Sequence, residues 1–245
     1  MRRRATMTWA RVACIAMLAA VLFGSRLPGA LAADATPRRV PDTMAERVLA
    51  CVACHGEEGR ATAEGYFPRI AGTPAGYLYN QLVNFRDGKR VNPMMTYLVD
   101  NLGDAYLRDI AAHFAALNPP YAAPQAGKAS AAQSARGRQL ATAGDAALKL
   151  PACAACHGER LTGVAPAVPG LLGLPRDYLA SQLGAWKNKS RHAAAPDCMA
   201  EVVGLLSAAD MAAVTAWLSA QAVPAQSGAA PPALKALPLA CGGLR

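Results

Sequence analysis

The chain has 245 residues and a formal net charge of +9, with 53% hydrophobic and 17% charged residues. Residues 1–32 hold five arginines and no acidic residue, so the remainder carries a charge of only +4. This modest charge, with no dense basic stripe interleaved with aromatic side chains, excludes nucleic acid as an expected partner. It suits transient docking to other proteins.

The N-terminal segment has the pattern of an export signal. Arg2, Arg3 and Arg4 form a basic start, residues 12–23 are almost wholly apolar, and residues 30–32 supply the small-x-small pattern that signal peptidase prefers. The apolar core of about twelve residues is shorter than the ~20 that a membrane-spanning helix needs. We therefore expect residues 1–33 to be a signal peptide and the mature protein to lie in the periplasm. An uncleaved membrane anchor is the alternative.

Two short motifs 102 residues apart carry the chemistry. Each reads Cys-x-x-Cys-His, which is the attachment signature of a c-type haem, with two thioether cysteines and a histidine placed to ligate the iron. The residues are Cys51, Cys54 and His55 in the first motif, and Cys153, Cys156 and His157 in the second. The pair predicts two covalently attached haem c groups. Zinc binding through the cysteine pairs is a weaker alternative, because the histidine follows each pair directly.

A longer internal repeat surrounds the two motifs. Residues 67–90 recur at 168–191, with the same Tyr-Leu-x-x-Gln-Leu pattern and a matching arginine, so the sequence predicts a duplicated domain. We expect an N-terminal domain over residues 34–118 and a C-terminal domain over 134–222. The intervening 119–133, rich in Ala, Pro, Gly, Ser and Gln, suits a linker. Residues 223–245, rich in Pro and Ala, suit a loosely ordered tail.

The periodicity within each copy is helical. Helices are predicted at about 44–50, 77–85, 104–117 and 207–221, the last opened by Ser207 with Asp210 three residues on. No convincing strand pattern appears, so the predicted fold class is all-α. Because eighty to ninety residues make a small core, we expect each domain to fold around its own haem.

The sixth ligand of each iron decides between electron transfer and ligand chemistry. Met95 lies eight residues before Gly103 and Met199 lies eight residues before Ser207, at matching places in the repeat, in what we expect to be the loop before each last helix. These two methionines are the predicted ligands. The rivals, which lack a partner in the other copy or adjoin a predicted ligand, are Met94, His113, His192 and Cys198.

Other repeated residues have expected roles near the haems. Pro68 and Pro169 follow the motif histidines by 13 and 12 residues, a distance at which a carbonyl can accept the histidine Nδ1–H. Simple turn prolines are the alternative. Arg90 and Arg191 are candidates to pair with haem propionates, or else are solvated surface arginines. Cys198 and Cys241 remain as an even pair, so a disulfide between them is open in an oxidising compartment.

With these motifs in place, residues 42–221 resemble the dihaem cytochrome c4 family. The resemblance implies two tandem cytochrome c folds with His/Met haems in a periplasmic electron carrier that often donates to a terminal oxidase. Two departures stand out: Asp197-Cys198-Met199, where the family usually has no cysteine, and an extension over 223–245.

The predicted function is single-electron transfer between redox proteins without catalysis of a reaction. Expected donors are a quinol-oxidising complex or a dehydrogenase, and the expected acceptor is a haem-copper terminal oxidase. Membrane contact is expected only through a partner or an uncleaved signal. One alternative is a cytochrome subunit of a periplasmic dehydrogenase. A haem enzyme of the peroxidase or thiosulfate-oxidising type comes third, because it needs an exchangeable ligand that only Cys198 suggests.

Overall fold

The computed structural model describes residues 41–62, 64–124, 129–232 and 236–244. The chain divides into a unit of residues 1–41 and a compact unit of residues 42–245. The predicted signal peptide at residues 1–33 lies outside the described residues. All structural statements below concern the second unit.

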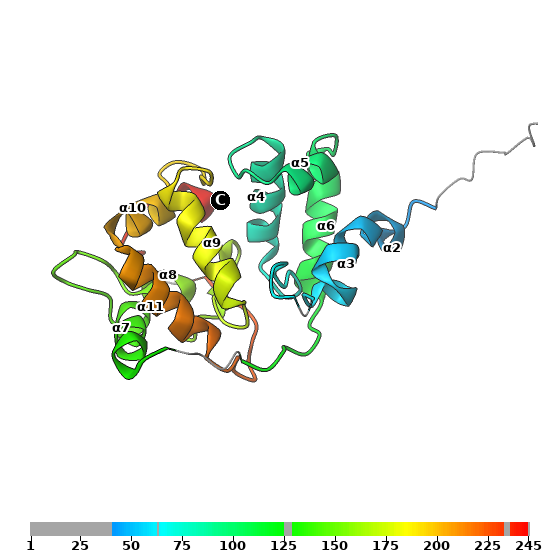
Figure 1. Ribbon diagram of the computed structural model, residues 1–245. Coiled ribbons are helices and arrows are strands. Elements are labelled where there is room, and N and C mark those ends of the chain that lie inside the picture. Colours follow the sequence, from blue (N-terminus) through cyan, green and yellow to red (C-terminus); the bar gives the residue numbers. More distant parts are fainter. Residues whose placement is uncertain (1–40, 63, 125–128, 233–235, 245) are drawn as a thin grey trace, which may run out of the picture. The chain divides into compact units, whose positions relative to one another are not determined.

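The first copy of the repeat is built from five α-helices and a 3₁₀ turn. They are α2 Met44–Arg47, α3 Leu49–His55, η1 Glu57–Gly59, α4 Ala75–Arg86, α5 Pro93–Val99 and α6 Asp104–Ala116. Thr43 starts α2, because its side chain accepts from the backbone N–H of Glu46. The long helices α4 and α6 lie side by side (Figure 1) and bury Leu78, Phe85 and Phe114.

The second copy repeats this order, with a longer helix in front of the motif: α7 has 12 residues where α2 has four. Its elements are α7 Ala131–Thr142, α8 Cys153–His157, α9 Arg176–Lys187, α10 Cys198–Leu205 and α11 Ala208–Ser219. The predicted start of the last helix is confirmed, because Ser207 and Asp210 form a reciprocal capping box. Leu140, Leu179 and Leu218 belong to the buried cluster that joins α7, α9 and α11 (Figure 1).

Three features differ from the sequence-based expectation. A two-stranded antiparallel ribbon, β1 Gly163–Val164 and β2 Val168–Pro169, interrupts the helical pattern. Helix α7 was not among the predicted helices and begins within the segment expected to be linker. The two candidate methionines lie in the first turns of the short helices α5 and α10 rather than in loops.

The fold class is all-α, as predicted, with only these short strands. Within the described part of the chain no single helix has both the length and the apolar composition to cross a bilayer. Helices α10 and α11 meet those criteria only as a pair, and they are bent by 112° at their junction.

Candidate haem sites

The first attachment motif lies at the end of α3. Cys51 and Cys54 are three residues apart on this helix, so they share one face, and neither forms a disulfide. Burial raises the pKa of the Cys51 thiol. Gly56 ends the helix at φ 76°, and a Cβ there would lie 2.4 Å from the Ala61 carbonyl oxygen, so the turn after the motif needs glycine.

His55 is held in one orientation. It is 9% exposed, and its Nδ1 lies 2.8 Å from the Pro68 carbonyl oxygen. A carbonyl only accepts, so Nδ1 carries the hydrogen and Nε2 keeps its lone pair. Burial lowers the pKa of His55, although the Pro68 hydrogen bond opposes this shift. The result is a neutral imidazole with Nε2 ready to bind a metal.

The second motif repeats this geometry on α8. His157 is 8% exposed, and its Nδ1 lies 2.8 Å from the Pro169 carbonyl oxygen. Burial again lowers the pKa of the histidine, and it raises the pKa of the Cys153 thiol to about 11. Cys153 and Cys156 are free of disulfide bonds. Both prolines therefore lie where the sequence placed them relative to the histidines.

The two candidate methionines have different surroundings. Met95 is half-buried against the cluster of Phe85, Val99 and Leu107, whereas its neighbour Met94 is 60% exposed. Met199 is half-buried at the second position of α10. Of the two adjacent methionines in the first copy, Met95 is therefore the one that faces the protein interior.

The rival ligands are engaged elsewhere or lie away from the motifs. Cys198 is bonded to Cys241 in a disulfide, so it has no thiolate to offer. His192 is exposed, with Nε2 2.8 Å from the Lys189 carbonyl oxygen. His113 is half-buried in α6, and its ring packs edge-on against its neighbour Phe114.

Arg90 and Arg191 meet at the junction of the two copies. Their backbones form an isolated antiparallel bridge, and each guanidinium binds the glutamine of its own copy and the glutamine and tyrosine of the other copy. Arg191 donates to Tyr77 Oη at 2.9 Å and to Gln81 Oε1 at 3.0 Å, and it stacks 3.8 Å over the Trp186 ring.

These contacts are all to neutral groups. Arg191 is 3% exposed, and no ion pair found among the described residues includes it or Arg90. Burial lowers the pKa of Arg191. Burial of Tyr77 disfavours its ionisation, yet the charges of Arg191 and Arg90 outweigh this and leave the tyrosine pKa below its ordinary value. Two positively charged side chains thus lie close together at this junction, and their printed partners are neutral.

The glutamines and tyrosines of this junction were not singled out from the sequence. The sequence showed Tyr77 and Gln81 only as part of the repeated Tyr-Leu-x-x-Gln-Leu pattern, and in the structure both lie on α4 and accept hydrogen bonds from Arg191. The sequence feature that could have identified this junction is the recurrence of Gln81 as Gln182 at the same place in the repeat.

The donor set fits a covalently attached haem at each motif. Each site supplies two free thiols for thioether bonds and one neutral, oriented imidazole for the iron. Outside these motifs, the described residues contain no group of three or more His, Cys, Asp or Glu that could hold a metal ion.

Comparisons with known proteins identify the family. The cytochrome c family profile matches residues 134–222. A thiosulfate dehydrogenase electron acceptor from Thiomonas intermedia is 36% identical over 171 residues, which cover 70% of this chain and 78% of that protein. Cytochrome c4 from Pseudomonas aeruginosa is 34% identical over 174 residues, which cover 70% of this chain and 84% of the relative.

Solved structures agree. Reduced recombinant cytochrome c4 from Pseudomonas stutzeri gives a TM-score of 0.62 at 30% identity, covering 74% of this chain and 99% of that one. A thiosulfate dehydrogenase from Marichromatium purpuratum gives 0.63 at 32% identity, covering 70% of this chain but only 36% of that longer chain. The protein therefore belongs to the dihaem cytochrome c4 family and is a c-type cytochrome that carries electrons on two covalently attached haems.

Proposed function

We propose that this cytochrome acts in the periplasm as an electron acceptor for a sulfur-compound dehydrogenase of the thiosulfate dehydrogenase type. The observation that carries this proposal is the similarity to two thiosulfate dehydrogenase electron acceptors, at 36% and 35% identity over 171 residues each. A cytochrome region within a thiosulfate dehydrogenase chain has the same fold. Delivery of these electrons to a haem-copper terminal oxidase completes the proposed role.

The proposed site has one axial pair for each iron. His55 and Met95 hold the first, and His157 and Met199 hold the second. Haem iron supplies a one-electron Fe(III)/Fe(II) couple, and methionine ligation raises its reduction potential. Pro68 and Pro169 fix the histidine tautomers by accepting the Nδ1–H. Arg90 and Arg191 stabilise the propionates at the junction.

The geometry best supports a protein that carries electrons and has no enzymatic activity of its own. The residue that suggested an exchangeable ligand is Cys198, and its sulfur is bonded to Cys241. Both proposed ligand pairs are complete without it. A thiosulfate-oxidising or peroxidase-type enzyme needs an exchangeable iron ligand, and this disulfide removes the sequence feature that suggested one.

The test mixes the oxidised holoprotein with thiosulfate, with and without a purified thiosulfate dehydrogenase, and follows haem reduction by stopped-flow absorbance. We expect reduction of both haems only when the dehydrogenase is present. Reduction by thiosulfate alone would show an intrinsic activity and refute the carrier role. No reduction with the dehydrogenase present would refute this donor while leaving the family assignment intact.

The iron ligands are tested by Met95→Leu and Met199→Leu, with Met94→Leu as the matched control. Methionine–ferric iron coordination gives a weak charge-transfer band in the red. We expect Met95→Leu and Met199→Leu each to remove the contribution of one haem and to lower one of the two potentials. Met94→Leu should leave both unchanged. A loss of the band in Met94→Leu instead would move the first ligand by one residue.

A further inference from the structure

The described residues of the C-terminal segment are held at several points, in contrast to the loose tail expected from its composition. Ala230 forms a parallel bridge with β1, in which the Ala165 N–H donates to its carbonyl at 2.8 Å and its own N–H donates to Gly163 at 2.9 Å. Thr162 Oγ1 donates to the Gly228 carbonyl at 3.1 Å. The segment thus pairs with an edge of the small β-ribbon in the second copy.

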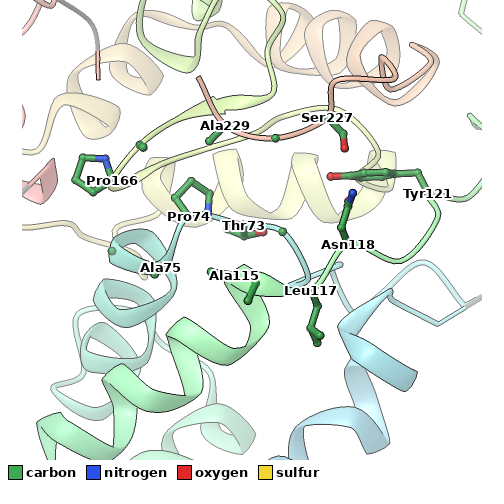
Figure 2. Close-up of a pocket in the computed structure, with 15 residues that line it drawn as sticks. Thr73, Pro74, Ala75, Ala115, Leu117, Asn118, Tyr121, Pro166, Ser227 and Ala229 are labelled. Carbon is green, nitrogen blue, oxygen red and sulfur yellow. The ribbon is translucent and has the colours of Figure 1, made fainter. Parts of the chain in front are cut away.

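The same segment also borders the first copy. Figure 2 shows Ser227 and Ala229 on one side of a cavity of about 510 Å³, with Thr73 and Pro74 of the first copy among the residues that line it. Near the end of the chain, Asn80 Nδ2 on α4 donates to the Gly243 carbonyl at 2.9 Å. The tail therefore contacts helix α4 of one copy while it is bonded to the other.

A disulfide closes this segment onto the start of α10. Cys241 is bonded to Cys198, 43 residues earlier in the chain, with 5.1 Å between their Cα atoms. The next residue, Gly242, donates its N–H to the Pro196 carbonyl at 2.9 Å. Its approach is so close that a Cβ would lie 2.1 Å from the Ala195 carbonyl oxygen. Only glycine fits beside the disulfide.

Cys198 is the first residue of α10 and Met199 is the second. Asp197 caps this helix through the Ala200 N–H at 3.0 Å and also accepts from Trp186 Nε1 on α9 at 3.3 Å. Helix α10 has eight residues, and a helix of this length is not stable by itself in water. Its position therefore depends on ties to the rest of the molecule, and the disulfide is the covalent one.

In the first copy, no disulfide among the described residues joins helix α5, which carries Met95, to another segment. Asn92 Oδ1 accepts from the Met95 N–H at 3.1 Å, and Thr96 Oγ1 donates to the Phe85 carbonyl at 2.9 Å. These contacts are local to α5 and to the adjoining end of α4. The two methionine helices are thus held differently: α5 by local hydrogen bonds, and α10 by a disulfide in addition to its N-cap.

We propose that residues 223–232 and 236–244 act as a disulfide-locked strap that positions Met199 for the second haem iron, with Cys198 and Cys241 as positioning residues. This inference rests on the proposed ligand role of Met199. By fixing the first turn of α10, the strap keeps the methionine sulfur at the iron as the protein warms. By bonding Cys198, it also keeps a competing thiol away from that iron.

The test is the double variant Cys198→Ser/Cys241→Ser of the full-length holoprotein, which opens the strap without leaving a free thiol. We expect the methionine–iron band of one haem to disappear at a lower temperature than in the wild type. We also expect the potential of that haem to fall, while the potential of the other haem stays unchanged. A purely structural disulfide would lower the unfolding temperature and leave both potentials of the folded protein as they are.

Two further variants keep the outcomes separate. Asn80→Ala removes the contact of the strap with α4 but leaves the disulfide, so both potentials should match the wild type. Unchanged band and potentials in the double variant would overturn the strap proposal. A full band in Met199→Leu would remove the ligand on which it rests, and this result is independent of the cysteine variants.

Discussion

The two copies share one haem-attachment geometry and differ in what surrounds it. In both, the motif histidine is buried and donates Nδ1–H to a proline carbonyl at 2.8 Å. In both, a basic side chain at the end of the central helix binds carbonyls at the end of the methionine helix. Arg86 does so at Leu102, and Lys187 does so at Val203, Gly204 and Leu206.

Two supports of the second copy are long-range. The tail pairs with the edge of the β-ribbon, and the disulfide joins the tail to α10. The helix in front of the motif differs in length: α7 has 12 residues and packs on α11, whereas the four-residue α2 of the first copy packs on α6. Arg136 on α7 binds both Asp145 and Asp210 at 2.7 Å, as Arg47 on α2 binds both Asp42 and Asp109 in the first copy. The attachment geometry is thus kept while the scaffold around it diverged, and the two haems should respond differently to the same perturbation.

The largest expected difference follows from removing haem attachment in one copy at a time. Cys51→Ser/Cys54→Ser should leave one haem per chain and unfold the first copy, whose small core has no disulfide among its described residues. Cys153→Ser/Cys156→Ser should also leave one haem but retain more helix, because α7, the tail and the disulfide remain. Haem content and far-ultraviolet circular dichroism measure both effects. Near-native helicity in the first variant would contradict the comparison.

The haem-attachment residues could be predicted from the sequence because they lie close together in the chain. The motif residues, the histidine–proline spacing and the capping box of Ser207 with Asp210 depend on residues near one another in the chain. The helical class and the cytochrome c4 family followed from the repeat of these local signals.

The structural features that could not be predicted from the sequence depend on contacts between segments that are distant in the chain. Helix α7 buries Gly137, Leu140 and Ala141 against α11, and a Cβ at Gly137 would lie 2.3 Å from the Ala213 carbonyl oxygen. Small residues make such a close-packed face, and they also resemble a linker in composition. The disulfide and the strap were undetermined for the same reason, because sequence does not show which distant cysteines meet.

The next largest effect is expected at the junction of the copies. Arg191→Ala removes hydrogen bonds to Gln182, Tyr77 and Gln81 from a buried guanidinium and should lower the free energy of unfolding by about 3 kcal/mol. Loss of a positive charge near the propionates should also lower both reduction potentials. Arg90→Ala is the matched control and should act in the same direction on the potentials. Chemical denaturation and a redox titration measure the two effects. A drop in stability with unchanged potentials would assign these arginines to packing alone.

A smaller effect in the second copy should depend on pH. Hydrogen bonds from Arg136 lower the pKa values of Asp145 and Asp210 below the ordinary 3.8. Since the folded-state values lie below the unfolded ones, this stabilisation is complete above about pH 4 and is lost as the pH falls through the folded-state values. Arg136→Ala should lower the thermal midpoint by a few degrees at neutral pH and converge with the wild type in acid. An equal deficit at all pH values would attribute the effect to packing of the arginine stem.

The smallest effect is expected from removing one of the local contacts that hold α5 in the first copy. Thr96→Val keeps the shape of the side chain but removes its hydrogen bond to the Phe85 carbonyl, at a cost of about 1 kcal/mol. If the first methionine helix is held only by such contacts, the band of the first haem should fade at a lower temperature while that of the second is unchanged. The repeat places Ala200 at the equivalent position of α10, so the second copy has no hydroxyl to lose there and depends on the strap instead. Variable-temperature absorbance of the ferric protein makes the measurement, in the Met199→Leu background for the first haem and in the Met95→Leu background for the second. An equal response of both haems to Thr96→Val would mean that α5 and α10 are coupled through the junction, and the division between a locally held and a strapped methionine would then fail.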